Sequence, residues 1–204
     1  AASPRFAPVT DNTQKDTVRE KYRLPQKFLL FVGNNNPRKN LKRIMQAFGI
    51  LKDQEKIPHQ LIIAGEQGWK FKPEDVLRTV QHPDAIRFIG FVPDEDMPTL
   101  YSMADLFLFP TLYEGFGIPV LEAQMCGTPV LTSCSSSMRE VGGQGAVYVN
   151  PYREADIGAG ILEVLKDPGA AQDLIAKGFE NVKRFSWDSS AQLLNTIIEE
   201  EVKE

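Results

Sequence analysis

Two carboxylates, Glu114 and Glu122, are separated by seven residues around a turn that contains Gly115, Phe116 and Gly117. Ionised carboxylates accept paired hydrogen bonds from vicinal hydroxyls, such as those of ribose and hexose. Backbone N–H groups at the start of a helix hold phosphate, because they point at the ligand and the helix dipole favours negative charge. The segment therefore predicts a site for a ligand that carries both sugar hydroxyls and a diphosphate.

The flanking sequence predicts the elements that position these side chains. The apolar run 106–109 is typical of a buried strand, and residues 119–125 are typical of a helix with Pro119 near its first turn. Gly115 and Gly117 then lie in the strand-to-helix turn, where the lack of Cβ lets a ligand approach the backbone closely. We expect Glu122 in the first turn of this helix and Glu114 on the preceding loop, with both carboxylates facing one crevice.

This segment resembles the Glu-x7-Glu signature of the retaining, family 4-like glycosyltransferases that have the GT-B fold. Further matches follow in order along nearly the whole chain: Phe31-Val32-Gly33, Pro37-Arg38-Lys39-Asn40-Leu41, Ile63-Ala64-Gly65, Ile89-Gly90-Phe91-Val92, Tyr101-Ser102-Met103-Ala104-Asp105, Cys126-Gly127-Thr128-Pro129-Val130 and Arg184-Phe185-Ser186-Trp187. The resemblance is to the C-terminal, donor-binding half of such an enzyme. It implies transfer of a hexose from a nucleoside-diphosphate sugar, UDP favoured over GDP, to a saccharide or lipid-linked acceptor with retained anomeric configuration.

Length and composition agree with half of such an enzyme. The 204 residues are enough for one α/β domain, whereas a GT-B enzyme has two. A net charge of −4 gives no basic footprint and so excludes nucleic acid as an expected partner. No apolar run approaches the ~20 residues of a membrane span, and residues 1–5 lack a signal-peptide core. We expect a cytoplasmic protein, whose full-length form can still contact a membrane surface.

Six short apolar runs predict the strands of one sheet, at residues 28–32, 61–64, 86–89, 106–109, 130–132 and 146–149. Their apolarity is continuous rather than alternating, which indicates strands buried on both faces of a parallel sheet covered by helices. The predicted fold is a doubly wound, Rossmann-like α/β sandwich. Ligands in such sheets bind outside the carboxyl ends of the strands, where the motifs above are expected.

The chain divides into three predicted parts. Residues 1–23 resemble a linker and short helix from a missing N-terminal domain, and the first eleven residues are expected to be extended and poorly anchored. Residues 24–185 form the nucleotide-sugar-binding domain. Residues 186–204 form a C-terminal helix, capped by Ser186, that in the family crosses toward the N-terminal domain. That domain is the expected partner that binds the acceptor, and part of the helix's apolar face should be exposed without it.

The loop after the first strand supplies the expected phosphate-binding cations. The resemblance assigns Lys39 to the donor diphosphate. The family often has arginine directly after the glycine of this loop, where the chain has Asn34 after Gly33. Arg38 is the nearest substitute, although its side chain can instead point to solvent. The alternative for residues 37–40 is an ordinary polar loop ahead of a helix.

The resemblance also assigns the remaining contacts. It gives the ribose hydroxyls to Glu122 and the hydroxyls of the transferred sugar to Glu114. The base is expected to meet the backbone near Phe91-Val92. Charge on the leaving phosphate would be stabilised by the two cations and by the helix dipole, so no metal cofactor is expected. The expected catalytic residues are Glu114, Lys39 and Arg38, and the expected donor-binding residues are Gly33, Asn34, Val92, Gly115, Phe116, Gly117, Ile118 and Glu122.

Other interpretations of these motifs are weaker. Residues 115–120 nearly match a dinucleotide fingerprint, but Val120 stands where the third glycine belongs. Asp94-Glu95-Asp96 looks like the metal-binding Asp-x-Asp of another glycosyltransferase fold, yet its place before 97–103 favours a helix cap. Cys126 and Cys134 flank a predicted strand, so we expect buried free thiols rather than a disulfide. A sugar-nucleotide-binding module without transfer activity, and more weakly a sugar-nucleotide epimerase, remain alternative functions.

Overall fold

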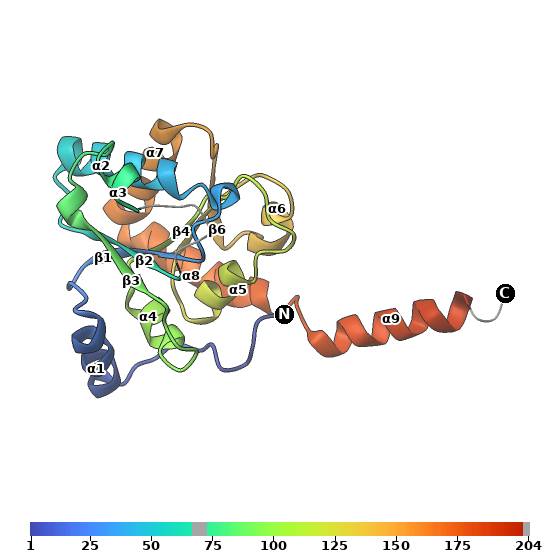
Figure 1. Cartoon of the computed structure of the whole chain (residues 1–204). Helices are drawn as coiled ribbons and strands as arrows, with labels where there is room; N and C mark the ends of the chain where they lie inside the picture. Colours follow the sequence, from blue (N-terminus) through green and yellow to red (C-terminus); the bar gives the residue numbers. More distant parts are fainter. Residues whose placement is uncertain (67–72, 202–204) are drawn as a thin grey trace.

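The structure, a computed structural model, describes residues 1–66 and 73–201. Its centre is a six-stranded sheet of order β3-β2-β1-β4-β5-β6 in which every paired strand is parallel (Figure 1). The strands are β1 (Phe28–Val32), β2 (Gln60–Ala64), β3 (Ile86–Gly90), β4 (Leu106–Phe109), β5 (Val130–Ser133) and β6 (Ala146–Val149). The six predicted strands and the doubly wound α/β fold are confirmed. Strand order reverses between β1 and β4.

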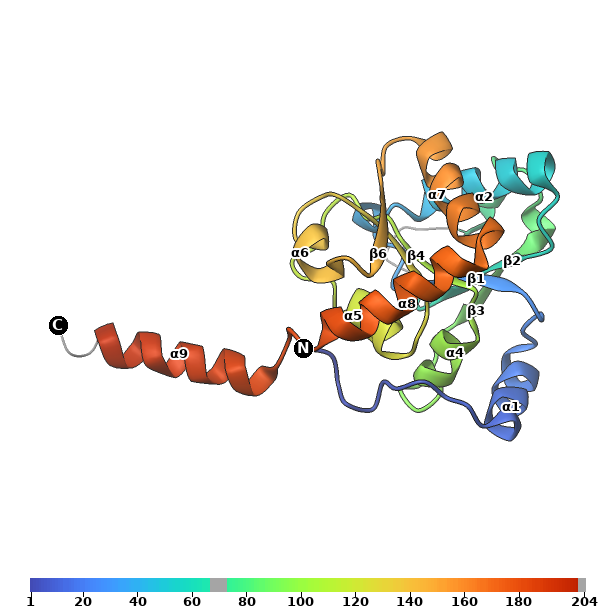
Figure 2. The ribbon, with the colours of Figure 1, turned by 180° about the vertical axis from the view of Figure 1, so that it is seen from behind.

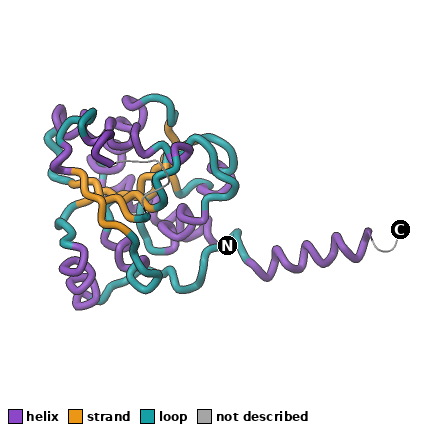
Figure 3. Tube along the Cα trace, in the orientation of Figure 1, coloured by secondary structure: helices purple, strands orange, loops and turns teal. Residues whose placement is uncertain are grey.

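Helices cover both faces of the sheet, so that the strands form a middle layer (Figure 3). Helices α2 and α7 lie on one face, and α1, α4 and α5 on the other; α8 packs against both α5 and α7 (Figure 2). The helical elements are α1 (Asn12–Tyr22), the 3-10 turn η1 (Pro37–Lys39), α2 (Leu41–Glu55), α3 (Pro73–Leu77), η2 (Pro83–Ala85), α4 (Met97–Met103), α5 (Ile118–Met125), α6 (Met138–Gly142), α7 (Glu154–Lys166), α8 (Pro168–Val182) and α9 (Trp187–Glu201).

Strand β1 shows how one continuous apolar run serves two cores. Successive strand side chains point to opposite faces. Phe28 and Leu30 are fully buried in the core that includes α1, α4 and α5, whereas Leu29 and Phe31 are fully buried in the core with α2 and α7. The central strands are therefore buried on both faces of the sheet. A ligand can reach them only where they end, and in parallel sheets it binds outside their carboxyl ends.

The N-terminal segment is well anchored, and the prediction of a poorly anchored linker was wrong. Phe6 is buried, with its ring edge-on to that of Tyr101 at a centroid distance of 6.0 Å. The Val9 N–H donates to Ser102 Oγ at 3.0 Å, and Arg5 pairs with Asp94 at 2.6 Å. Burying a phenylalanine contributes about 1.5–3 kcal/mol, which outweighs the local preference of this proline-containing stretch for extended, solvated backbone.

The acidic run before α4 ties α1 to the body rather than capping a helix as predicted. Asp96 occupies the N-cap position of α4, but its side chain makes no capping hydrogen bond. Its Oδ2 instead accepts from Lys21 Nζ at 2.7 Å and from the Tyr22 hydroxyl at 2.6 Å. The Asp96 carboxylate therefore serves as acceptor for the two donors of α1 and makes no bond to the first turn of α4.

Helix α9 leaves the body of the protein as a separate rod (Figure 1). Its predicted cap is confirmed, since Ser186 Oγ accepts from the Ser189 N–H at 3.2 Å. The expected exposure of its apolar face is also confirmed. Five large apolar side chains of this helix are between 48% and 63% exposed, namely Trp187, Leu193, Leu194, Ile197 and Ile198.

The two cysteines differ in environment. Neither forms a disulfide, as predicted. Cys126 is buried, and burial raises the pKa of its thiol to about 12. Cys134 is exposed, contrary to the expectation of two buried thiols, because it follows β5 at the point where the chain leaves the sheet.

Candidate functional site

The loops that follow β1 and β4 meet at the carboxyl edge of the sheet, where the strand order reverses. The Leu112 N–H donates to the Arg38 carbonyl at 2.7 Å. Asn40, which is buried in a left-handed conformation, donates from Nδ2 to the carbonyls of Pro110 at 3.0 Å and Pro151 at 2.6 Å. These bonds hold the β1 and β4 loops against each other, and the segment after β6 against them, at the place where doubly wound sheets bind ligands.

Lys39 occupies a nearly closed position between these loops. The Asn36 side chain accepts from the Arg38 N–H and starts the turn that carries the lysine. The Lys39 side chain is 11% exposed, and its Nζ lies 4.9 Å from the centroid of the Phe109 ring, within cation–π range. A Cβ on Gly33 would come within 2.7 Å of this Nζ, and Gly33 has φ of +144°. The positive φ favours glycine there, and the absence of a Cβ leaves room for the lysine side chain.

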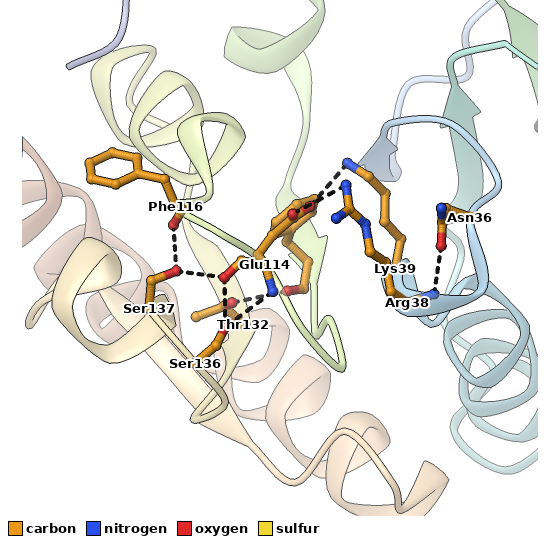
Figure 4. A network of polar contacts seen from close by, with 9 residues as sticks. Asn36, Arg38, Lys39, Glu114, Phe116, Thr132, Ser136 and Ser137 are labelled. Carbon is orange, nitrogen blue, oxygen red and sulfur yellow. Dashed lines mark hydrogen bonds and ion pairs between the residues drawn. The ribbon is translucent and has the colours of Figure 1, made fainter.

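The Glu114 carboxylate faces both predicted cations, which reach it from the β1 loop, as Figure 4 shows. Its Oε1 is 3.4 Å from Lys39 Nζ, and its Oε2 is 3.7 Å from Arg38 Nη2. The carboxylate side chain is 10% exposed, whereas that of Arg38 is 48% exposed. Arg38 therefore reaches the site, yet half of its side chain remains in solvent. Asn34, at the position where the family often has arginine, is exposed.

Two serines that sequence reasoning missed hold the backbone of the glycine turn (Figure 4). Ser136 Oγ accepts from the Glu114 N–H at 3.1 Å and lies 2.9 Å from the Glu114 carbonyl. Ser137 Oγ donates toward the carbonyls of Glu114, at 3.1 Å, and Phe116, at 2.9 Å. The Phe116 ring packs edge-on to Phe185 at a centroid distance of 5.8 Å and remains 38% exposed. No local motif marks the serines, which become neighbours of the turn only through pairing of β4 with β5.

The two glycines of the turn have different reasons to be glycine. Gly117 is the N-cap of α5 with φ of +103°, and a Cβ there would come within 2.3 Å of Met138 Cε. Gly115 has a negative φ, and a Cβ there would meet no heavy atom within 4 Å. Gly117 is thus required by packing and backbone, whereas Gly115 borders open space beside the start of α5 at Ile118.

Glu122 lies in the second turn of α5, not in the first turn as predicted, because the helix begins at Ile118 and a turn takes about 3.6 residues. Its Oε2 accepts from the hydroxyl of Tyr101 at 3.0 Å. Burial raises the pKa of the Glu122 carboxyl, and the hydrogen bond from Tyr101 acts in the opposite direction. Glu122 is therefore a partly desolvated acceptor with one oxygen already bound.

Glu122 lines a pocket of about 240 Å³ at the carboxyl ends of β1, β2 and β3. The pocket brings together three predicted donor-binding residues, Gly33, Asn34 and Val92, with Glu122. Glu114 and Lys39 are not among its lining residues; Lys39 lies behind Gly33, where its charge still favours the ionised form of Glu122. Phe91, which the sequence placed beside Val92 at the base, also lines the pocket. Residues that sequence reasoning did not assign to the site line it as well, namely Phe6, Val32, Ala64, Gly65, Asp94 and Met97.

Two negative findings apply to the described residues. No group of three or more His, Cys, Asp or Glu side chains within 1–66 and 73–201 is arranged to hold a metal ion. In the same part of the chain, no helix is both long and apolar enough to cross a bilayer.

A larger hollow of about 540 Å³ between Gly143 and α8 contains none of the predicted site residues.

Taken together, the geometry offers hydroxyl acceptors at two points and positive charge between them. Glu122 presents an acceptor carboxylate to the pocket, and Glu114 presents one on the loop next to Gly115. Lys39 and Arg38 supply positive charge next to Glu114. The arrangement suits an elongated ligand with hydroxyls at both ends and negative charge in its middle.

Comparison with known proteins finds relatives in sequence and in structure. O-antigen chain mannosyltransferase B of Escherichia coli is 38% identical over 184 residues, which cover 87% of this chain and 48% of that enzyme. Sucrose-phosphate synthase from Thermosynechococcus elongatus superposes with a TM-score of 0.81 at 24% identity, over 100% of this chain and 51% of its own. The C-terminal domain of a glycosyl transferase group 1 family protein from Francisella tularensis superposes with a TM-score of 0.76 at 18% identity, over 90% of this chain and 97% of that domain.

The family match covers most of the chain. This chain spans about half the length of the curated mannosyltransferase, 48%. The family model described as Glycosyl transferases group 1 matches residues 14–181, which include both carboxylates, the Lys39 loop and the pocket apart from Phe6. The chain belongs to the group 1 glycosyl transferases.

Proposed function

We propose that this chain is the donor-binding half of a retaining, family 4-like glycosyltransferase that transfers a hexose from a nucleoside-diphosphate sugar to a saccharide or lipid-linked acceptor. The observation that carries the proposal is the placement of Glu122 in a pocket next to the Lys39–Glu114 ion pair, at the point where strand order reverses. Carboxylates that can accept hydrogen bonds from sugar hydroxyls thus lie next to a cation that can bind phosphate.

The parts of the donor lie in order from the pocket to Glu114. The nucleoside occupies the pocket, with its ribose hydroxyls on Glu122 and its base near Val92. The diphosphate passes Gly33 and reaches Lys39 and the start of α5. The transferred sugar then lies beside Gly115, with its hydroxyls on Glu114. This order is supported by the open space at Gly115 and by the position of Lys39 between the pocket and Glu114.

Charge stabilisation in the proposed reaction comes from the protein. Negative charge grows on the diphosphate as its bond to the anomeric carbon breaks. Lys39, Arg38 and the amino-terminal end of α5 would stabilise that charge electrostatically, in the role that a metal ion has in other transferases. We therefore propose a metal-independent reaction. The name of the E. coli relative points to mannose as the first hexose to test, and we keep UDP over GDP as the expected nucleotide.

The proposal gives the other half of the enzyme to a second domain. Half of the related mannosyltransferase has no counterpart in this chain, and the exposed apolar face of α9 is suited to contact that second domain. The acceptor would bind between the two domains. We place the full-length enzyme in the cytoplasm, with contact to a membrane surface if its acceptor is lipid-linked.

Transfer by the full-length protein tests the proposal. The protein would be incubated with UDP- and GDP-hexoses, mannose donors included, and with saccharide and lipid-linked acceptors in excess chelator. We expect release of nucleoside diphosphate together with a product whose anomeric configuration, read by NMR, matches that of the donor. Inverted configuration or a strict need for divalent metal would contradict it. Binding without transfer would indicate a sugar-nucleotide-binding module, and acceptor-free conversion of the donor sugar an epimerase.

A further inference from the structure

Tyr101 of α4 contacts the pocket carboxylate from inside the protein. The side chain is fully buried, and its hydroxyl donates to Glu122 Oε2 at 3.0 Å. A buried phenol needs a hydrogen-bond partner, and Glu122 is the partner that the structure gives it. The bond joins α4 to α5 directly below the pocket.

The tyrosine ring is fixed from several sides. Phe6 of the N-terminal segment packs edge-on to it at 6.0 Å and 68°, and Phe107 of β4 does so at 5.3 Å and 79°. The Tyr101 carbonyl accepts from Thr128 Oγ1 at 2.7 Å. The ring thus has one position, which fixes the direction from which its hydroxyl reaches Glu122.

Because of this contact, the two carboxylate oxygens of Glu122 have different partners. One oxygen, Oε2, accepts from Tyr101, and the other is left for a ligand in the pocket. A glutamate on a helix otherwise has three rotatable bonds, and ordering them on binding would reduce affinity. A carboxylate already held in place avoids that loss.

We propose that Tyr101 is a positioning residue of the donor site, whose hydroxyl orients Glu122 so that its free oxygen meets the ribose hydroxyls of the nucleotide. The inference rests on the proposed function, since it takes the ribose contact of Glu122 from there. It adds a residue that touches no ligand and makes the pocket depend on the N-terminal segment through Phe6.

A measurable consequence is the pH dependence of nucleotide binding. The groups that act on the Glu122 carboxyl are Tyr101, Asp94, Arg5 and Lys39: burial and Asp94 raise its pKa, whereas the Tyr101 hydrogen bond and the two cations lower it. Removing the hydroxyl therefore raises the folded-state pKa further. Because the ionised carboxylate is the stronger acceptor, affinity should begin to fall at a higher pH as the solution is acidified.

The test is a calorimetric titration of Tyr101→Phe with UDP, or with GDP if that is the nucleotide found to bind, across a pH series. Phenylalanine keeps the ring contacts with Phe6 and Phe107. Tyr148→Phe is the matched control, because it removes a hydroxyl that donates to the Gly143 carbonyl at 2.7 Å outside the pocket. Glu122→Gln supplies the baseline, since the ligand's own phosphate also titrates, with a pKa near ~6.

We expect Tyr101→Phe to weaken nucleotide binding roughly two- to tenfold at neutral pH, the effect of losing one hydrogen bond. Its affinity should fall at a higher pH than that of the wild type, and Tyr148→Phe should match the wild type. In the Glu122→Gln background, Tyr101→Phe should change affinity no further, because it acts through that carboxylate.

The outcomes separate this inference from the function on which it rests. Unchanged affinity and pH profile in Tyr101→Phe would overturn the inference. An equal further loss in the Glu122→Gln background would also overturn it, because the hydroxyl would then act on structure in general, and this cycle is interpretable even if the variants are less stable. If Glu122→Gln itself binds nucleotide as tightly as the wild type, the ribose assignment of the proposed function fails instead.

Discussion

The two carboxylates of the glycine turn occupy different electrostatic environments. Glu114 lies on a loop and pairs with two cations, Lys39 at 3.4 Å and Arg38 at 3.7 Å. Glu122 lies on a helix and pairs with a neutral phenol, Tyr101, at 3.0 Å. We therefore expect one residue type within one short motif to serve two tasks, since the surroundings of each carboxylate differ in charge and in hydrogen-bond partner.

The comparison also shows what the donor has to displace. Lys39 pairs with Glu114, and both side chains are nearly buried. Separating such a pair is costly unless new partners replace the old ones. In the proposed site, a nucleoside-diphosphate sugar would bring phosphate to Lys39 and hydroxyls to Glu114 together, whereas a nucleoside diphosphate would bring only the phosphate. The loop end of the site, at Glu114 and Lys39, should thus distinguish the sugar-bearing donor from the nucleoside diphosphate that is left after transfer. The pocket end, at Glu122, should bind both alike.

The largest effect is expected from Lys39→Ala, which removes the nearly buried cation. Binding of the nucleoside diphosphate should weaken more than tenfold, because a hydrogen bond to a charged group contributes about 1.5–3 kcal/mol, and binding of the nucleoside should change little. Calorimetric titration with both ligands measures the difference. Lys42→Ala is the matched control, an exposed lysine three residues further along the chain.

Equal losses for nucleoside and nucleoside diphosphate in Lys39→Ala would mean that the lysine supports structure rather than phosphate. The substitution can disturb the structure, because it leaves the nearly buried Glu114 carboxylate with Arg38 as its one remaining cation partner among the described residues. Circular dichroism of the variant therefore accompanies the titration.

The next effect in size is expected from Glu122→Gln at the pocket end. It should weaken UDP and UDP-hexose alike, by on the order of 1–3 kcal/mol, because both ligands carry the same ribose. Glu163→Gln, on the exposed side of α7, is the control for loss of one acidic charge. A variant that binds UDP normally but loses only the sugar-bearing donor would place the ribose elsewhere.

A narrower effect is expected from Glu114→Gln at the loop end. It should leave UDP affinity undiminished, because the substitution frees Lys39 for phosphate, and weaken the sugar-bearing donor by on the order of 1–3 kcal/mol. In the full-length enzyme it should also lower turnover, since a contact on the transferred sugar orients the reacting carbon.

The comparison of the two variants decides the assignment of roles. If both remain folded and impair plain UDP to the same extent, the division into a ribose carboxylate and a sugar carboxylate has to be abandoned. If Glu114→Gln tightens UDP, the competition between carboxylate and phosphate for Lys39 is supported directly.

The sheet could be predicted from the sequence because it depends on local runs of apolar residues. Runs such as 106–109 are long enough and apolar enough to determine a buried strand on their own, and all six were placed correctly. The glycine turn was also readable, since Gly115 and Gly117 mark the end of a strand and the start of a helix.

The remaining features depend on contacts between distant segments. The ion pair of Glu114 with Lys39 spans two loops joined by strand pairing, and the Tyr101–Glu122 bond spans two helices. Phe6 belongs to a segment whose composition resembles a solvated linker, yet one aromatic side chain anchors it beside the pocket. No local sequence pattern predicts these contacts. Glu122 was predicted in the first turn of α5 and lies in the second, because the exact start of a helix is poorly marked in the sequence.

Titration of the unaltered chain with UDP and with GDP in excess chelator tests the central claim most directly, that a metal-independent nucleotide site lies at the junction of the β1 and β4 loops. The account predicts saturable binding of one nucleotide per chain, with an affinity that chelator does not change and that Lys39→Ala reduces more than tenfold. Absence of binding by either nucleotide, or binding that appears only when a divalent metal is restored, would contradict it.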